Sequence, residues 1–512
     1  MSSVRVYARN IFANWSGHAI NLALVMVGSW YAYRVLGDMR FGVWSLVLSV
    51  AGYLGMADIG LRPALYRYYN WYLGKKDYAQ VAKVLSTSLA FFLVMTCFLF
   101  AAGVVLAMHF HRLFPRLPHH LLFEVRITVV LAAGTLGISA IGAVFNSLLD
   151  CHERYDLRNI VEIGAGAMKT CGVIVALYLG WGLVGMGLAL IASASAGSVV
   201  GWVLIRKVAS SRARISDVSL GTLGELLRFG IPCFFSTTGV RIVQYSHSII
   251  IAWLIGIKAV GYYSLGRMLL EYSHSFVQRA GTVFTPRIQQ SLAGGRLGEL
   301  RELVPYVTRI VMGFAVLMTI GIIMLGPEFL QRFYGVTVAQ RAGPLLPILG
   351  LGGLAGMATQ ATGAVVIGMG RVKYLAVVVL SQALADTAIA LVLVGGLGLG
   401  LEGMAWAHTL PIILISGILI PRAAICILGL GAKRFILDTA GYWLPAAAIF
   451  SLCVLLIEEI PLPATWFGFF WRVLVSVVSF MPIFWFIIVP LRDRHRIMAL
   501  VGRSVKEAWE AA

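Results

Sequence analysis

Residues 36–46 read LGDMRFGVWSL, and residues 255–265 read IGIKAVGYYSL. Two glycines, an aromatic residue and a Ser-Leu pair recur in these stretches at an offset of 219 residues. Residues 182–187 (GLVGMG) recur as 400–405 (GLEGMA) at an offset of 218, and the loop with Arg154 corresponds to Arg371 at an offset of 217. Glycine-rich turns can look alike by chance, but three nearly equal offsets indicate a duplicated half.

The composition predicts that the duplicated unit is a bundle of membrane-spanning helices. Of the 512 residues, 59% are hydrophobic and 12% are charged, whereas soluble proteins carry about 25% charged residues. A spanning helix needs about 20 apolar residues. The apolar runs predict an all-α polytopic membrane protein of about 14 transmembrane helices, at 11–33, 41–62, 84–108, 124–148, 160–180, 183–205, 226–256, 260–286, 304–326, 342–369, 373–396, 399–421, 436–459 and 467–491. This leaves no segment for a separate soluble catalytic domain.

The charge distribution predicts the orientation in the membrane. The chain carries 41 Lys and Arg residues against 22 Asp and Glu residues. With the N-terminus in the cytoplasm, 28 of the basic residues fall in inner segments, 8 in outer segments and 5 inside spans. Because basic loops stay on the cytoplasmic side, both termini are expected there. The basic excess is then a topology signal, and we expect no nucleic-acid partner.

The repeat and the spans together predict the domain organisation. An even number of spans per half makes the two repeats parallel about an axis along the membrane normal. We therefore expect two parallel six-helix lobes around a central cavity, which is a carrier design. The predicted segments are an N-terminal lobe at 1–206, a cytoplasmic linker at 207–225, a C-terminal lobe at 226–424, two additional helices at 425–491 and a cytoplasmic amphipathic tail at 492–512.

The span at 260–286 carries the most informative polar face of the chain. Arg267, Glu271, His274 and Gln278 follow the spacing i, i+4, i+7, i+11, which places them within an arc of about 60°. The corresponding positions of the first half are apolar. Ionisable residues inside a membrane usually face a cavity or each other, so this face is a candidate site of the second half.

Other polar residues within predicted spans extend the candidate site. They are Asn14, His18, Glu162, Lys169, Arg241, Tyr245, Arg279 and Asp386. Guanidinium groups bind phosphate oxygens bidentately and stay charged when desolvated. A cavity with Lys169 and three arginines would therefore suit an anionic group such as a diphosphate, and the amide, imidazole and phenol groups would suit sugar hydroxyls.

Structural explanations compete with these assignments. Arg267 with Glu271, and Glu162 with Lys169, could be satisfied pairs within one helix, because an unpaired buried charge is costly. The asparagines of the first span could serve helix packing. His408 is expected to be a packing residue.

The sequence lacks the motifs of several kinds of metal, nucleotide and catalytic site. The six cysteines have no paired spacing, so they are expected to be free thiols without a metal. There is no phosphate-binding loop and no His-Glu-x-x-His. We therefore expect no enzyme activity, no metal and no bound cofactor.

The chain resembles a known family in a series of short motifs spread over residues 1 to about 425. They are VLG at 35–37, FGVW at 41–44, ADIGL at 57–61, VGYY at 260–263, TPR at 285–287, GPEF at 326–329, FYG at 333–335, GMGR at 368–371 and GLEGMA at 400–405. In order and spacing they are similar to the bacterial polysaccharide transporters, the O-antigen and exopolysaccharide flippases of the multidrug/oligosaccharidyl-lipid/polysaccharide (MOP) exporter superfamily.

The resemblance implies a flippase in the bacterial inner membrane. Such a protein moves an undecaprenyl-diphosphate-linked oligosaccharide from the inner to the outer leaflet by alternating access, with optional H⁺ or Na⁺ coupling. Lys169, Arg241 and Arg267 would hold the diphosphate, with Arg279 at the inner mouth. The sugar would meet Asn14, His18, Gln278 and Tyr245, and the ion-responsive groups would be Glu271, His274, Asp386 and Glu162.

The same resemblance leaves two alternatives. Drug and cation antiporters belong to the same superfamily, and the carboxylates in the spans keep this reading open. An accessory subunit of a polysaccharide synthase complex is the other. The expected partners are the lipid-linked oligosaccharide, membrane lipids, and glycosyltransferases or a polymerase that build the same glycan.

Overall fold

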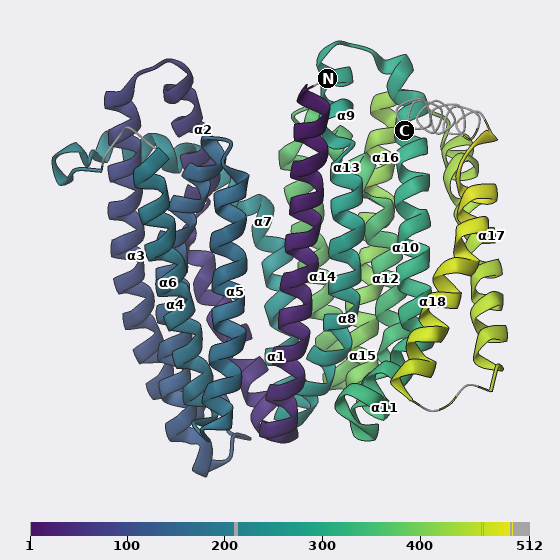
Figure 1. Ribbon diagram of the computed structural model, residues 1–512, viewed down its shortest axis with the longest axis horizontal. Coiled ribbons are helices and arrows are strands. Elements are labelled where there is room, and N and C mark those ends of the chain that lie inside the picture. Colours follow the sequence, from purple (N-terminus) through teal and green to yellow (C-terminus); the bar gives the residue numbers. More distant parts are fainter. Residues whose placement is uncertain (1, 209–212, 462, 464, 492–493, 495–512) are drawn as a thin grey trace, which may run out of the picture. The chain divides into compact units, whose positions relative to one another are not determined.

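The computed structural model describes residues 2–208, 213–461, 463, 465–491 and 494, without the side chains of 2–19, 57, 236 and 237 (Figure 1). Every regular element in these ranges is a helix, which confirms the all-α class. The predicted tail at 492–512 lies outside the described residues except for Arg494, and so do residues 209–212 of the predicted linker.

The longer helices carry most of the chain. They are α1 (Ser2–Leu54), α3 (Tyr78–Leu113), α4 (Leu122–Cys151), α5 (Tyr155–Tyr178), α6 (Gly182–Val208), α7 (Leu220–Leu254), α8 (Ile257–Thr282), α10 (Leu297–Tyr334), α14 (Val372–Ala390), α17 (Ala432–Glu458) and α18 (Trp466–Ile483). The shorter ones are α2 (Leu61–Gly74), α9 (Thr285–Ala293), α11 (Val336–Ala342), α12 (Leu345–Ala358), α13 (Gln360–Gly368), α15 (Gly400–Pro411) and α16 (Gly417–Leu428), with π-helical turns at Leu391–Gly396, Ile412–Ser416 and Phe484–Ile488.

The number of membrane spans predicted from the sequence is not confirmed. Within the described residues, 11 helices are long and apolar enough to cross a membrane, or 12 if the two halves of α7, bent by 54°, form one span. Predicted spans 11–33 and 41–62 both fall largely within α1, but Gly37, with φ 68° and ψ −179°, is not helical, so two helices meet there at a kink. Glycine tolerates this conformation, whereas a side chain would be strained. The predicted span 260–286 overlaps α8, which is not among these 11 helices, so about 14 spans are not confirmed.

The helices form two compact units, which are described separately. The first comprises Met1–Ser264 with Val394–Leu397, and the second comprises Leu265–Leu393 with the chain from Gly398 onward. Helix α7 packs against α1, α2 and α3 and therefore belongs to the first unit, although the repeat places it in the predicted C-terminal lobe. The lobe boundaries drawn from the duplication stay a prediction.

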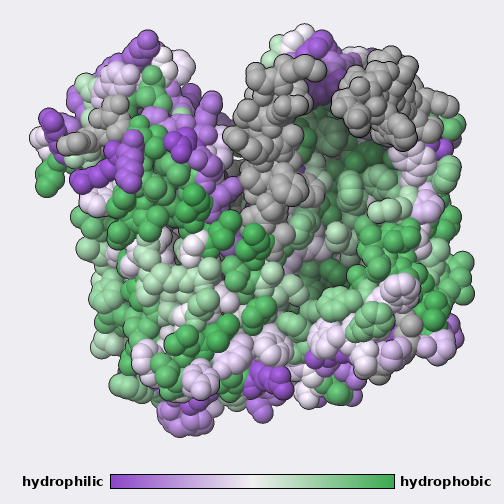
Figure 2. Space-filling view, in the orientation of Figure 1, coloured by the Kyte–Doolittle hydropathy of each residue, from purple (hydrophilic) through white to green (hydrophobic). Residues whose placement is uncertain are grey.

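Small residues let the helices of the first unit approach closely. Helix α4 packs between α3 and α6, and α6 also contacts α5 (Figure 1). A Cβ added to Gly137 of α4 would lie 2.6 Å from Cγ2 of Thr96, and one added to Gly142 would lie 2.5 Å from Oγ of Ser198. Such contacts are typical of membrane helix packing, where dispersion replaces the hydrophobic effect. On this bundle, apolar side chains fill the middle and hydrophilic ones gather at the ends (Figure 2).

Helix α2 packs on one end of the first unit. Its buried residues Leu61, Leu65 and Tyr69 join a core with α3 and α4. The turn before it crosses α7 at two glycines: a Cβ on Gly60 would lie 2.1 Å from the carbonyl oxygen of Gly230, and Gly60 has φ +71°. This crossing fixes α2 against α7.

The second unit is built around α10. Its core includes Val307, Val311 and Ala315 of α10 with Phe450 of α17 and Phe480 of α18. The two C-terminal helices are thus part of this core, at the edge of the second unit (Figure 1). Glu328 joins α10 to α18. Its carboxylate pairs with Arg332, one turn further along α10, and with Nη1 of Arg472 on α18 at 3.0 Å.

Replacement of Gly60 by Ala is expected to destabilise the first unit. The added methyl group meets a backbone oxygen in a left-handed conformation, which together costs about 2 kcal/mol or more. The check is the apparent melting temperature of the purified protein in detergent. Gly74→Ala is the matched control, since no atom lies within 4 Å of its added Cβ; equal melting of the two variants would contradict the crossing.

Replacement of Glu328 by Gln is expected to loosen the C-terminal helices from α10. Arg472 and Arg332, with side chains 17% and 18% exposed, would lose their counter-charge. For a partly buried network the loss is about 1–3 kcal/mol. Asp438→Asn removes an exposed pair with Arg434 and should cost less than about 0.5 kcal/mol. Protease sensitivity of the 458–466 connection reports the loosening, and unchanged sensitivity of Glu328→Gln would refute the anchoring role.

Candidate functional site

The first unit has an open cavity between α1, α4, α5 and α6, and its lining combines polar and apolar residues. Its volume is about 500 Å³. Glu162 and Lys169, both predicted from the sequence, lie on its wall with Asn21 of α1 and Asn146 of α4. Hydroxyl groups complete the polar lining, from Thr135, Ser139, Ser193 and Ser198. The structure thus brings two predicted site residues together with amides and hydroxyls that the sequence analysis did not assign.

Of the two charged residues that line this cavity, Glu162 has an ion-pair partner and Lys169 has none among the described residues. Nε of Arg158 lies 2.8 Å from Glu162, and Nη1 of the same side chain lies 2.9 Å from Asp150. The pair of Glu162 with Lys169 that the sequence allowed is therefore not formed. Lys169 has neither an ion pair nor a hydrogen bond to the residues that the structure describes. Lys169 is the charged group of this cavity that a ligand could neutralise.

A second basic group of the first unit lies where α1 ends. Nη1 of Arg241 on α7 donates to the carbonyl oxygen of Gly55 at 3.4 Å. Arg62 pairs with Asp58 at 3.6 Å. Burial lowers the pKa of Arg62, Asp58 opposes this shift, and the nearby charge of Arg241 adds to it. The guanidinium groups of Arg62 and Arg241 are therefore close enough to repel each other, and Asp58 pairs with Arg62.

Sequence reasoning missed Arg62 as part of this group. Arg62 lies at the end of the predicted span 41–62 and was not assigned to a site. The sequence does contain a signal for it, because Arg62 directly follows the ADIGL motif at 57–61, which is one of the stretches that carry the family resemblance. The predicted residue Tyr245 also lies here, with its ring against the backbone of Gly52, where an added Cβ would lie 2.3 Å from Cε1.

In the second unit, the polar face of α8 is partly an ion pair. Nη2 of Arg267 lies 2.6 Å from the Glu271 carboxylate, which confirms the intrahelical pair that competed with a binding role. His274 packs against the backbone of Gly353, and its Nε2 is buried without a hydrogen-bond partner in the described structure. The side chains of Gln278 and Arg279 are exposed. The face can bind an anion through Arg267 only in competition with Glu271.

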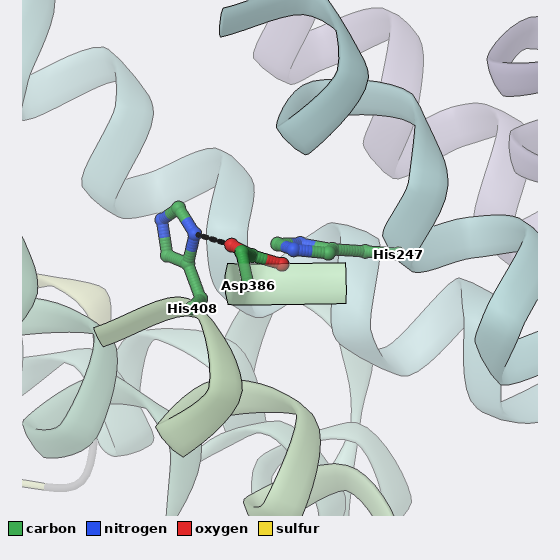
Figure 3. Close-up of side chains that lie close together, drawn as sticks. All are labelled: His247, Asp386 and His408. Atoms are coloured by element: carbon green, nitrogen blue, oxygen red, sulfur yellow. Dashed lines mark hydrogen bonds and ion pairs between the residues drawn. The ribbon is translucent and has the colours of Figure 1, made fainter. Parts of the chain in front are cut away.

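Asp386 forms the most buried carboxylate arrangement of the second unit. Its side chain is completely buried on α14, and Nδ1 of His408 on α15 lies 3.1 Å from its Oδ2 (Figure 3). His408, expected to be a packing residue, is thus the partner of a buried acid. An imidazole beside a carboxylate can share or exchange one proton, which is the chemistry that ion coupling needs.

The predicted site residues divide between the two units. Glu162, Lys169, Arg241 and Tyr245 belong to the first unit, whereas Arg267, Glu271, His274, Gln278, Arg279 and Asp386 belong to the second. The side chains of Asn14 and His18 lie outside the described residues. One site containing all of these residues stays a prediction.

Comparisons with known proteins agree with the sequence resemblance. A protein of Shigella flexneri described as an O-antigen transporter is 22% identical over 270 residues, which cover 50% of this chain and 60% of that protein. The chain thus matches less than two thirds of that relative. The relatives are transporters and a flippase rather than enzymes, as expected for this chain.

Solved structures with the same fold come from the MOP superfamily. An inward-facing multidrug resistance transporter of the MATE family gives a TM-score of 0.71 at 15% identity, covering 80% of this chain and 94% of the other. The lipid II flippase MurJ in an inward closed conformation also gives 0.71, at 11% identity, covering 93% and 98%. The sequence profile of the family described as polysaccharide biosynthesis protein matches residues 7–292, more than half of the chain. The chain therefore belongs to the polysaccharide biosynthesis protein family, and its fold is that of the MOP exporters.

Proposed function

We propose that the chain is a flippase for an undecaprenyl-diphosphate-linked oligosaccharide, an O-antigen or exopolysaccharide repeat unit, in the bacterial inner membrane. The family match over residues 7–292 carries this proposal. The relative described as an O-antigen transporter and the fold shared with a lipid II flippase support it. The 28 to 8 distribution of basic residues supports a cytoplasmic position of both termini, and the proposed movement is by alternating access.

The diphosphate is assigned to guanidinium groups. Arg241 with Arg62 in the first unit and Arg267 in the second offer forked donors that match phosphate oxygens. Arg279 is exposed at the end of α8 and would meet the ligand at the inner mouth. Sugar hydroxyls would meet Tyr245 and Gln278. Glycosyltransferases and a polymerase of the same glycan are the proposed partners.

Ion coupling is proposed for the carboxylates, but the energetics do not require it. An anion that leaves an inside-negative cell gains about 2.3 kcal/mol per charge for each 100 mV. The buried Asp386 with its partner His408 is the best candidate for a proton- or sodium-responsive group. Glu271 and His274 on α8 are the further candidates. The fold shared with a drug transporter keeps an antiporter as the second candidate function.

The leaflet in which the glycan lipid accumulates separates the candidate functions. In a deletion strain, undecaprenyl-linked sugar should accumulate without becoming accessible from the periplasm, and surface polymer should be lost. Normal export with increased sensitivity to cationic drugs would instead support the antiporter. Normal export, intact drug resistance and co-purification with a glycosyltransferase would support the accessory subunit.

Replacement of Arg267 separates a ligand role from a structural one. Complementation with Arg267→Ala should lower polymer export about tenfold, the effect of losing about 1.4 kcal/mol of charged hydrogen bonding. The double variant Arg267→Ala/Glu271→Gln removes both partners of the pair and should show the same tenfold lower export. If the double variant restores export, or if Arg267→Ala exports normally, Arg267 does not bind the substrate. Arg434→Ala, at an exposed pair, is the control.

A further inference from the structure

We propose that the cavity of the first unit is a separate subsite for a sugar that carries one carboxylate, with Lys169 as its counter-ion. The inference rests on the proposed function for its biological meaning, because it names a class of glycan that the flippase would carry. In this proposal Lys169 binds the carboxylate of the sugar and not the diphosphate, to which the sequence resemblance assigned it.

The position of Lys169 requires a counter-charge. It lies near the middle of α5 (Tyr155–Tyr178), so its side chain leaves the helix about halfway between the two ends. A charge at such depth is costly unless it is paired or solvated. Glu162 is seven residues away, about 10 Å along the helix axis, and is bound to Arg158. Within the described structure, the protein supplies no anion to Lys169.

The cavity is built to let polar groups face it. Gly166 lies on the same face of α5 as Glu162 and Lys169, and an added Cβ there would lie 2.3 Å from Oδ1 of Asn21. The glycine thus lets the amide of α1 reach α5. On the opposite wall, Oδ1 of Asn146 is buried with no hydrogen-bond partner in the described structure. An acceptor in this state calls for a donor from a ligand or from water.

The remaining polar lining consists of hydroxyl groups with free acceptor capacity. Thr135, Ser193 and Ser198 each donate to a backbone carbonyl of α4 or α6, at 2.7, 2.8 and 3.1 Å. Their oxygens can still accept from a ligand. Together with Asn146, the lining offers several acceptors for hydroxyl donors and one cationic donor. A polyhydroxylated ligand matches this pattern.

The number and type of charges select the ligand class. Lysine is a compact point charge, whereas bidentate phosphate recognition favours arginine. One ammonium group balances one negative charge, so a diphosphate would be left uncompensated here. The volume of about 500 Å³ lies within the range of roughly 300–1,000 Å³ for ligand pockets. A uronic acid combines one carboxylate with several hydroxyls and meets these requirements.

The test measures binding rather than transport. Purified full-length protein in detergent is titrated with methyl β-D-glucuronide and with methyl β-D-glucoside, by saturation-transfer NMR. The wild-type protein should prefer the glucuronide at least tenfold. Lys169→Gln should remove this preference and leave the glucoside unchanged, whereas Lys169→Arg should retain most of it. Lys83→Gln, an exposed lysine of α3, should bind like the wild type.

A second variant guards against misfolding of Lys169→Gln. Asn146→Asp adds a negative charge to the cavity and should also remove the preference for the glucuronide, with a monodisperse elution profile as the folding check. Equal binding of both sugars by the wild type, or a preference that survives Lys169→Gln, overturns the inference. Because the test is binding alone, a protein that prefers the glucuronide but does not flip lipid-linked glycan would contradict the proposed function and not the subsite.

Discussion

A charged side chain at the centre of a membrane helix costs about 2.5–3.5 kcal/mol or more unless it is paired or reaches water. This constraint sorts the ionisable residues of the chain. Glu328 is shared by two arginines that tie α10 to α18, Arg158 bridges Asp150 and Glu162, and Arg267 is paired with Glu271. The pairs of Arg472 with Glu328 and of Arg158 with Asp150 join different helices, whereas Arg267 and Glu271 pair within α8. The groups that are left without a protein counter-charge are the ones that can recognise a ligand.

The cavity of the first unit shows how packing creates such a group. Small residues bring α4 close to α3 and α6, and Gly166 admits an amide from α1 to the surface of α5. Arg158 takes up the charge of Glu162, so Lys169 remains available. In the second unit, the buried carboxylate of Asp386 lies 3.1 Å from Nδ1 of His408.

The sequence predicted the helical class and the family, because hydropathy and short motifs are local properties. It could not decide partners within a polar face. The spacing of Glu162 and Lys169 allowed a pair, but the side chain of Arg158, one turn before Glu162, reaches that carboxylate first. Gly37 lies between the predicted spans 11–33 and 41–62, and the backbone there leaves helical geometry, so two helices meet at a kink within α1. Asn146 could not be found from the sequence, since its position opposite Lys169 depends on how α4 packs on α5 and α6.

The most direct test of translocation uses the purified protein in liposomes. Undecaprenyl-diphosphate-linked oligosaccharide is placed in both leaflets, and a membrane-impermeant oxidant of the sugar then reports which fraction is accessible. With a functional flippase the inner-leaflet fraction becomes accessible over time, so oxidation approaches completion. Oxidation that stops at about half of the lipid, as in protein-free liposomes, would contradict the account.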